Sequence, residues 1–189
     1  AAQYGSMSLT MAKSGDFLHL FDLNQPYLDK PPLIFWLTSL SFKIFGISNF
    51  SYRLPSVLFA ILALWSTYKL TLLYYSRNTA QAALLILATC QCFFTMNTDV
   101  KTDMYLIGAV MFSVWQICLH LETRRWSPIF LGFLGLGLGM LSKGPLGVMI
   151  PMLAVGGDRF LRRDWWGIFN WRWVLGLPVL GLVILPFCI

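Results

Sequence analysis

Charged residues are scarce in this chain, and their scarcity excludes most classes of soluble protein. Only 12% of its 189 residues are Asp, Glu, Lys or Arg, whereas 57% are hydrophobic. The mean hydropathy is +0.66. A soluble domain carries about 25% charged residues. The composition therefore predicts an integral membrane protein of the all-α class, built as a polytopic helix bundle.

Cysteine is rare, and its placement excludes a disulfide framework or a zinc site. Cys90, Cys92 and Cys118 lie within apolar runs, and Cys188 lies near the end of another, which is typical of packing residues. The chain also lacks a Gly-rich phosphate loop, a long repeat and a low-complexity linker. We therefore predict a single domain over residues 1–189, and no soluble nucleotide sugar is needed.

An excess of basic residues gives a net charge of +6, but it does not indicate a nucleic-acid partner. The basic residues occur in short clusters between apolar runs, where they act as topology signals. Arg77, Arg124 with Arg125, and the cluster at 159–163 should all be cytoplasmic. We expect no nucleic acid among the partners.

The apolar runs predict about six membrane crossings over residues 53–189. Three runs approach the roughly 20 residues that a crossing helix needs, and these are Leu54–Leu73, Ala80–Met96 and Met104–Leu121. The apolar segment Pro128–Gly157 is broken near its midpoint at Lys143, Gly144 and Pro145, which predicts two short crossings. A last crossing begins at Trp173.

Counting crossings between basic clusters places the remaining polar motifs on one face. Two crossings separate successive basic clusters, so residues 98–103 and 142–145 fall on the opposite, outer side of the membrane. Arg53 and everything before it lie on that side too, because one crossing separates Arg53 from Arg77.

The segment 1–52 is predicted to be an outer-face loop that carries interfacial helices. A helical stripe is formed by Tyr4, Met7 and Met11, and a second stripe by Leu33, Trp36, Leu37, Leu40 and Ile44. The second segment has apolar residues off its stripe as well, so a short inserted helix is the alternative.

The motif YLDKPP presents Asp29 and Lys30 ahead of two prolines that fix the backbone. A lysine held rigidly at a membrane surface can bind a phosphate as a point charge, and the adjacent acid can pair with it or join a metal site. The alternative is a capped helix start with charges at the headgroup level.

Asp99 and Asp103 would share one helix face, near Lys101, if the helix that follows began early. Paired carboxylates can orient sugar hydroxyls or coordinate a divalent ion. Simple N-capping by Asp103 is the alternative.

Two further residues are candidates on the outer side. Lys143 lies between short Gly-rich segments and needs a surface or a hydrated cavity. His19 could bind a metal with Asp16 or Asp22, although an incidental structural role is the alternative, as it is for His120.

Four ordered motifs also carry a family resemblance: YLDKPPLIFWLTSLSFKIFG, RLPSVLFAI, KTDMYL and GLGMLSKGPLG. Together they resemble the bacterial branch of the protein O-mannosyltransferase superfamily, especially the lipid A aminoarabinose transferases. The resemblance covers almost the whole chain. It implies a GT-C glycosyltransferase that uses a polyprenyl-phosphate sugar on the outer face of the bacterial inner membrane.

The resemblance also assigns residues by position. Asp29 and Lys30 match the family's acid-Lys-Pro-Pro element, Asp103 matches an acid that opens a later span, and Lys143 matches the lysine of a Lys-Gly-Pro turn. Ala1 stands where the family often has the second residue of an acidic pair, so the catalytic base is expected just before it. The later spans and outer loop of the family are also expected to lie outside this chain.

The prediction that combines these observations is sugar transfer from a polyprenyl-phosphate donor to a lipid A-like, other lipid or protein acceptor. Lys30 would hold the phosphate, with Arg53 and Lys143 as supporting cations. Asp103 would orient substrate together with Asp99, and a divalent ion is considered at Asp29 and His19. The rival is a transporter or lipid-binding membrane protein, which would place its key polar groups near the membrane midplane.

Overall fold

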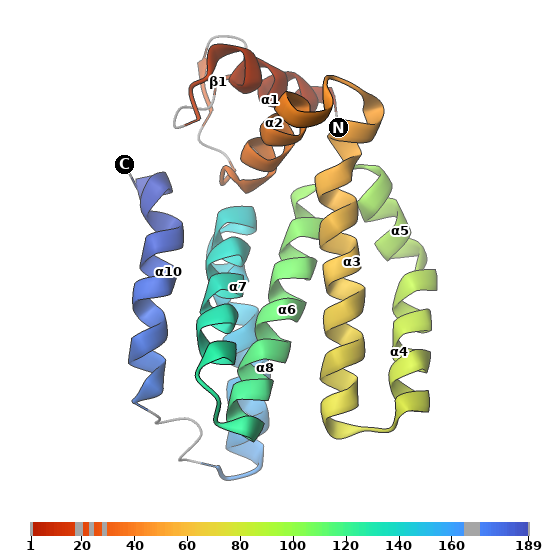
Figure 1. Ribbon diagram of the computed structural model, residues 1–189, viewed down its shortest axis with the longest axis vertical. Helices are drawn as coiled ribbons and strands as arrows, with labels where there is room; N and C mark the ends of the chain where they lie inside the picture. The colour runs from red at the N-terminus through yellow and green to blue at the C-terminus, as the bar shows by residue number, and fades with distance from the viewer. Residues whose placement is uncertain (1, 18–20, 23–24, 28–29, 165–170, 189) are drawn as a thin grey trace.

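The protein folds as a bundle of roughly parallel and antiparallel helices, with two further helices across one end (Figure 1). The computed structural model describes residues 2–17, 21–22, 25–27, 30–164 and 171–188. The bundle helices are α3 (Asn49–Tyr74), α4 (Arg77–Thr89), α5 (Gln91–Thr98), α6 (Thr102–Thr123), α7 (Ser127–Lys143), α8 (Leu146–Leu161) and α10 (Arg172–Cys188). The described part is all-α except for one short antiparallel ladder between β1 (Phe21–Asp22) and β2 (Gln25–Pro26).

Local sequence explains where several helices begin and end. Ser48 caps α3 through a capping box with Ser51, and the hydroxyl of Ser76 caps α4 by accepting from the Thr79 amide. α7 ends at Gly144, whose φ of 68° lies in the left-handed region. Pro145 then precedes α8, so the predicted break at the Lys-Gly-Pro turn is present.

The bundle has two chemically different ends. We call the end that carries α1 (Ala2–Ser14), α2 (Leu33–Phe45), the α5–α6 turn and the α7–α8 turn the site end. The opposite end, at the α3–α4 turn, the α6–α7 turn and the end of α8, is called the arginine end, because its turns carry the basic clusters. The polar motifs and the basic clusters therefore lie at opposite ends (Figure 1).

Two of the bundle helices, α3 and α6, are long and apolar enough to cross a membrane, and a third crossing results if α4 and α5 count as one bent span. The predicted span Ala80–Met96 is not straight, because the chain breaks at Cys90 and bends by 54° between α4 and α5. α7 and α10 are shorter apolar helices. The number of six crossings stays a prediction.

Close backbone contact joins α7 to α8. A Cβ atom added at Gly139 would lie 2.9 Å from the Gly147 Cα, and one added at Gly147 would lie 2.1 Å from the Gly139 carbonyl carbon. Only glycine fits at such an approach. These two short helices therefore pack directly against each other on either side of the Lys-Gly-Pro turn.

The two interfacial helices confirm one predicted stripe and correct the other. Met7 and Met11 of α1 are buried, as expected. On α2, however, Leu40 and Ile44 of the predicted stripe are 50% and 64% exposed. The residues that α2 buries are Leu33, Ile34, Phe35, Thr38, Ser39, Ser41 and Phe42.

Two serines explain why α2 presents this face. The Ser39 hydroxyl donates to the Ser8 carbonyl of α1 at 2.7 Å, and the Ser41 hydroxyl donates to the Ser51 carbonyl of α3 at 2.6 Å. Because both hydroxyls have partners, they can be buried at little cost. A pattern that counts only apolar residues therefore misplaced the buried face.

Candidate active site

One apolar cluster at the site end brings the separate sequence motifs together. Its buried members include Leu33, which follows Lys30, then Val100 of the α5–α6 turn, and Leu141 of the α7 end. Tyr105 of α6 completes this contact. The polar residues that flank these positions are therefore anchored to one common core, although they are far apart in sequence.

Lys30 lies against α1. Its ammonium group donates a hydrogen bond to the Tyr4 hydroxyl and lies 5.0 Å from the centre of the Tyr4 ring. Tyr4 in turn packs edge-on against Phe35, with ring centres 5.6 Å apart. Lys30 is partly buried, and its contacts with Tyr4 hold the ammonium group in place, as predicted for a rigidly presented cation.

The N-cap of the helix after Lys30 does not support the alternative of a side-chain-capped helix start. Pro32 occupies that position, and no side-chain hydrogen bond caps α2.

Asp103 and Lys143 form an ion pair across the site end. Asp103 lies in the first turn of α6, and Lys143 is the last residue of α7. Their side chains are 27% and 43% exposed, so both remain accessible to a substrate. Asp103 is not the N-cap of α6, since Lys101 occupies that position.

Asp99 and Asp103 do not share a helix face, so that prediction was wrong. α5 ends before Asp99, Val100 has a positive φ of 48°, and α6 begins only at Thr102. Asp99 instead pairs with Lys101 at 2.7 Å. The hydrogen bond from Lys101 holds the pKa of Asp99 below its usual value, and the same bond raises the pKa of Lys101.

Arg53 lines a hollow of about 630 Å³ at the site end. The hollow is bounded by α1, by the first turn of α3 and by Thr98, and Arg53 is exposed within it. The hollow that Arg53 lines is also lined by Gly5 of α1, whereas Lys30 contacts Tyr4 of the same helix. Arg53 therefore lies at the site end, and its role as a supporting cation stays a prediction.

The two residues to which a metal was assigned, Asp29 and His19, lie outside the described residues. Among the residues that the structure does describe, no three His, Cys, Asp or Glu side chains are grouped so that they could hold a metal ion. The divalent ion therefore stays a prediction.

Comparison with known proteins decides the family. Residues 29–189 match the family model described as dolichyl-phosphate-mannose-protein mannosyltransferase. The chain belongs to this family.

Curated relatives agree with the match. An uncharacterized protein of Aquifex aeolicus is 37% identical over 176 residues, which are 92% of this chain and 39% of the relative. The undecaprenyl phosphate-alpha-4-amino-4-deoxy-L-arabinose arabinosyl transferase of Photorhabdus laumondii is 27% identical over 158 residues, which are 81% of this chain and 29% of that protein. The chain therefore spans less than half the length of these relatives.

Solved structures show the fold. The crystal structure of ArnT from Cupriavidus metallidurans in the apo state has a TM-score of 0.88 and 22% identity, and the match covers 98% of this chain and 36% of that one. The same protein bound to undecaprenyl phosphate has a TM-score of 0.90 and 21% identity, with 98% and 35% covered. The all-α membrane bundle of GT-C type, with its interfacial helices, is confirmed.

Within this mannosyltransferase-family fold, Tyr4 is the site residue that sequence analysis missed. It was assigned only to a helical stripe, yet its hydroxyl and its ring both contact Lys30. No local pattern links the two, because 26 residues separate them. The only available signal was a tyrosine on an amphipathic helix, whose polar tip needs a partner.

Proposed function

We propose that the protein transfers a sugar from a polyprenyl-phosphate donor to a lipid A-like, other lipid or protein acceptor at the outer face of the bacterial inner membrane. The observation that carries the proposal is the convergence of Lys30, Asp103 and Lys143 at one end of an apolar helix bundle. Family membership supports a glycosyltransferase, and relatives with this fold carry the name of an arabinosyl transferase.

The reaction needs a cation at the leaving group and a carboxylate near the sugar. The acceptor hydroxyl oxygen forms a bond to the anomeric carbon, while the bond from that carbon to the phosphate oxygen breaks. Polyprenyl phosphate leaves with the electron pair, and the hydroxyl proton passes to a carboxylate. Negative charge therefore develops on the phosphate, where a preorganised cation stabilises it most.

Lys30 supplies that cation in our proposal. Its ammonium is held by the Tyr4 hydroxyl and ring, so little reorganisation is needed when a phosphate arrives. The ring of Tyr4 does not neutralise the charge, because a cation–π contact leaves the positive charge in place. The neighbouring acid, Asp29, would steer Lys30 or bind a divalent ion.

Asp103 is the carboxylate that we assign to the sugar. Because Lys143 pairs with it, the carboxylate of Asp103 is held in a fixed position. Lys143 acts through this contact and positions Asp103. Its charge is already compensated, which makes it a weaker phosphate ligand than sequence analysis expected.

Arg53 and Asp99 have supporting roles in the proposal. Arg53 adds positive potential at the hollow beside α1, where it could meet an anionic part of either substrate. Asp99 is occupied by Lys101, so its contribution is to order the turn before Asp103.

The orientation follows from charge. Since the arginine end carries the basic clusters, it should face the cytoplasm, and the site end should face the periplasm. A lipid-linked donor is reachable there without a soluble nucleotide sugar. Both a pentose and a hexose donor fall within the proposal.

Substitution of Lys30 tests the proposal. With the full-length protein and a panel of pentosyl and hexosyl polyprenyl phosphates, Lys30→Ala should lower donor turnover per folded protein by about 10²-fold or more. Lys30→Arg should restore only part of it, because a planar guanidinium does not reproduce a compact ammonium. Lys43→Ala is the matched control, since Lys43 also lies over a ring, that of Phe17, at 4.4 Å.

Two results would contradict the proposal. Near-wild-type turnover of Lys30→Ala would remove Lys30 from the site. Movement of an unmodified solute, with no glycosylated product from any donor and acceptor in the panel, would instead favour the transporter.

A further inference from the structure

An apolar groove runs along the bundle from the arginine end toward the α7–α8 turn. It has a volume of about 410 Å³ and is formed by α6, α7, α8 and α10. Its walls include Leu121, Leu136, Val155 and Trp173. Arg159 is the only charged residue among those described that line it. The proposed transfer reaction makes no use of this groove.

The rim of the groove is open to the surroundings. Met152 of α8 is 64% exposed, and Val174 of α10 is 62% exposed, although both line the groove. Within the described residues these apolar side chains are uncovered, and in a membrane protein such a surface is compatible with lipid. A lipid chain can therefore enter between α8 and α10 without unfolding either helix.

The length of the groove matches one leaflet of a bilayer. On α8 the lining extends from Val148 to Arg159. At a rise of ~1.5 Å per residue this segment is about 17 Å long. Half of the hydrocarbon core is about 15 Å. One acyl chain of a phospholipid fits this length, with its glycerol end at Arg159.

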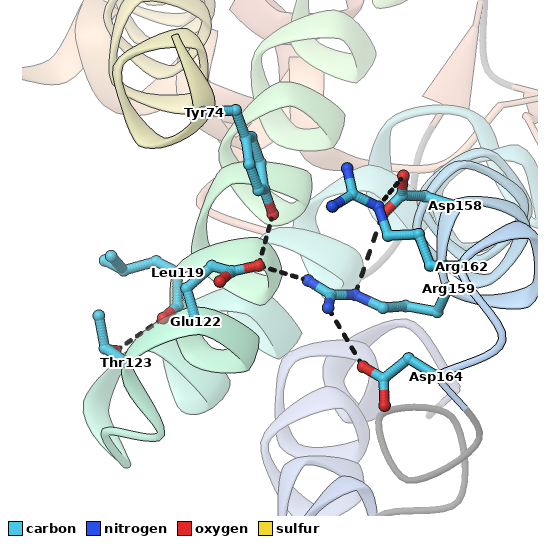
Figure 2. A network of polar contacts seen from close by, with 8 residues as sticks. All are labelled: Tyr74, Leu119, Glu122, Thr123, Asp158, Arg159, Arg162 and Asp164. Atoms are coloured by element: carbon cyan, nitrogen blue, oxygen red, sulfur yellow. Dashed lines mark hydrogen bonds and ion pairs between the residues drawn. The ribbon is translucent and has the colours of Figure 1, made fainter.

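Arg159, which lines one end of the groove, belongs to a network of polar contacts (Figure 2). Arg159 is only 8% exposed. Its Nη2 donates to Glu122 at 2.8 Å, and its Nη1 donates to Asp164 at 3.2 Å. Its Nε is buried with no hydrogen-bond partner among the described residues, the nearest Asp158 oxygen being 3.9 Å away. The guanidinium of Arg159 is therefore held by carboxylates at the polar end of an apolar groove.

The charges around this network favour an anionic headgroup. Six arginines and three carboxylates lie at this end of α6, α7, α8 and α10. Arg159 and Arg162 already pair with all three carboxylates. Arg124, Arg125 and Arg163 are exposed, and the structure records no ion pair for them within its described ranges. The surplus charge is therefore positive and accessible.

Aromatic residues mark the headgroup level at the same place. Trp126 and Trp171 are in edge-on contact, with ring centres 5.9 Å apart, and Arg172 lies 4.7 Å from the Trp126 ring centre. Tryptophan and arginine concentrate where the hydrocarbon core meets the headgroups. A lipid in the groove would thus have its phosphate at the level of the surplus arginines.

We propose that this groove binds one acyl chain of an anionic glycerophospholipid, whose phosphate lies at the arginine cluster beyond Arg159. The lipid belongs to the leaflet at the arginine end, whereas the polyprenyl-phosphate donor is placed at the site end. Its function is to complete the packing between α8 and α10. The site is therefore a second lipid site with its own chemistry.

Two adjacent glycines allow a matched test. Gly156 lines the groove, Gly157 does not, and an added Cβ atom meets nothing within 4 Å at either position. Gly156→Leu should therefore fill the groove without a clash, and Gly157→Leu should carry the same side chain outside it. The full-length protein in mild detergent would be given equal amounts of dioleoyl phosphatidylglycerol and dioleoyl phosphatidylcholine, and retained lipid counted by native mass spectrometry.

The wild type should retain phosphatidylglycerol in preference to phosphatidylcholine. Gly156→Leu should lower retained phosphatidylglycerol by about tenfold, since displacing even two methylene groups costs that much. Gly157→Leu should retain as much as the wild type. Replacing Arg124, Arg125 and Arg163 together by glutamine should abolish the preference for phosphatidylglycerol.

Three outcomes would overturn the proposal. These are retention of neither lipid by the wild type, equal retention of the two lipids by the wild type, and retention of as much phosphatidylglycerol by Gly156→Leu as by the wild type. Should Gly156→Leu fail to fold, brominated phosphatidylglycerol serves instead, because Trp173 lines the groove. It should quench more fluorescence in the wild type than in Trp173→Phe, and equal quenching would also overturn the proposal. Lipid counting does not depend on sugar transfer, so the two proposals are tested separately.

Discussion

Gly147→Ala should damage the active site without touching any residue in it. The new Cβ atom would lie 2.1 Å from the Gly139 carbonyl carbon and 2.4 Å from the Met140 amide nitrogen. Real Cβ contacts essentially never fall below 3.0 Å, so α7 and α8 must separate by about 1 Å. Both obstructing atoms belong to backbone, so no side chain can rotate away.

This displacement has two measurable consequences. Overpacking of this kind costs about 1–3 kcal/mol, which should lower the thermal unfolding midpoint in detergent. The separation also occurs next to the turn that carries Lys143, the partner of Asp103. A misplacement of about 1 Å can lower turnover by about 10²-fold. We therefore expect donor turnover to fall even when it is calculated per folded protein, so the lower stability alone will not explain the loss.

Gly157→Ala is the control for this experiment, because Gly157 does not line the groove. It is on the same helix, and its Cβ atom meets nothing within 4 Å. Alanine also favours a helix over glycine by about 1 kcal/mol, so this variant should be as stable as the wild type or more so. If Gly147→Ala has the same unfolding midpoint and the same turnover as Gly157→Ala, the close approach of α7 to α8 is not what positions Lys143.

Two further predictions concern the ion pair and the orientation. Asp103→Asn and Lys143→Met should each lower turnover. The double variant should lose no more turnover than Asp103→Asn alone, which corresponds to a coupling energy of about 0.5–3 kcal/mol. Additive losses would show that the two side chains act separately. In a background without native cysteines, Thr98→Cys should react with an impermeant thiol reagent added outside right-side-out inner-membrane vesicles, whereas Thr123→Cys should not. Labelling of both from one side would contradict the assignment of the two ends.

The sequence predicted the features that depend on local chemistry. The break between α7 and α8 follows from Gly144 and Pro145, and its position was correct. The burial of Met7 and Met11 followed from helical spacing. The grouping of polar motifs at one end followed from counting crossings, because an apolar helix must traverse the whole bundle.

The errors arose where long-range contacts decide. The buried face of α2 depends on Ser39 and Ser41, whose partners are backbone carbonyls on other helices. The bend at Cys90 could not be predicted from the residue itself, because it is neither a proline nor a glycine. The contact of Lys30 with Tyr4 depends on how α1 lies across the bundle. None of these can be derived from spacing along the chain.

The two buried serines of α2 also bear on how freely this end of the protein can change in sequence. Both hydroxyls donate to carbonyl oxygens of the main chain, which every amino acid provides. A substitution at residue 8 that fits the space and keeps the helix therefore preserves the hydrogen bond from Ser39 to the residue 8 carbonyl. A substitution of Ser39 that removes its hydroxyl would remove the donor of this bond, whichever residue stands at position 8. This hydrogen bond between α2 and α1 thus depends on the side chain of Ser39 alone, because its acceptor is a main-chain oxygen.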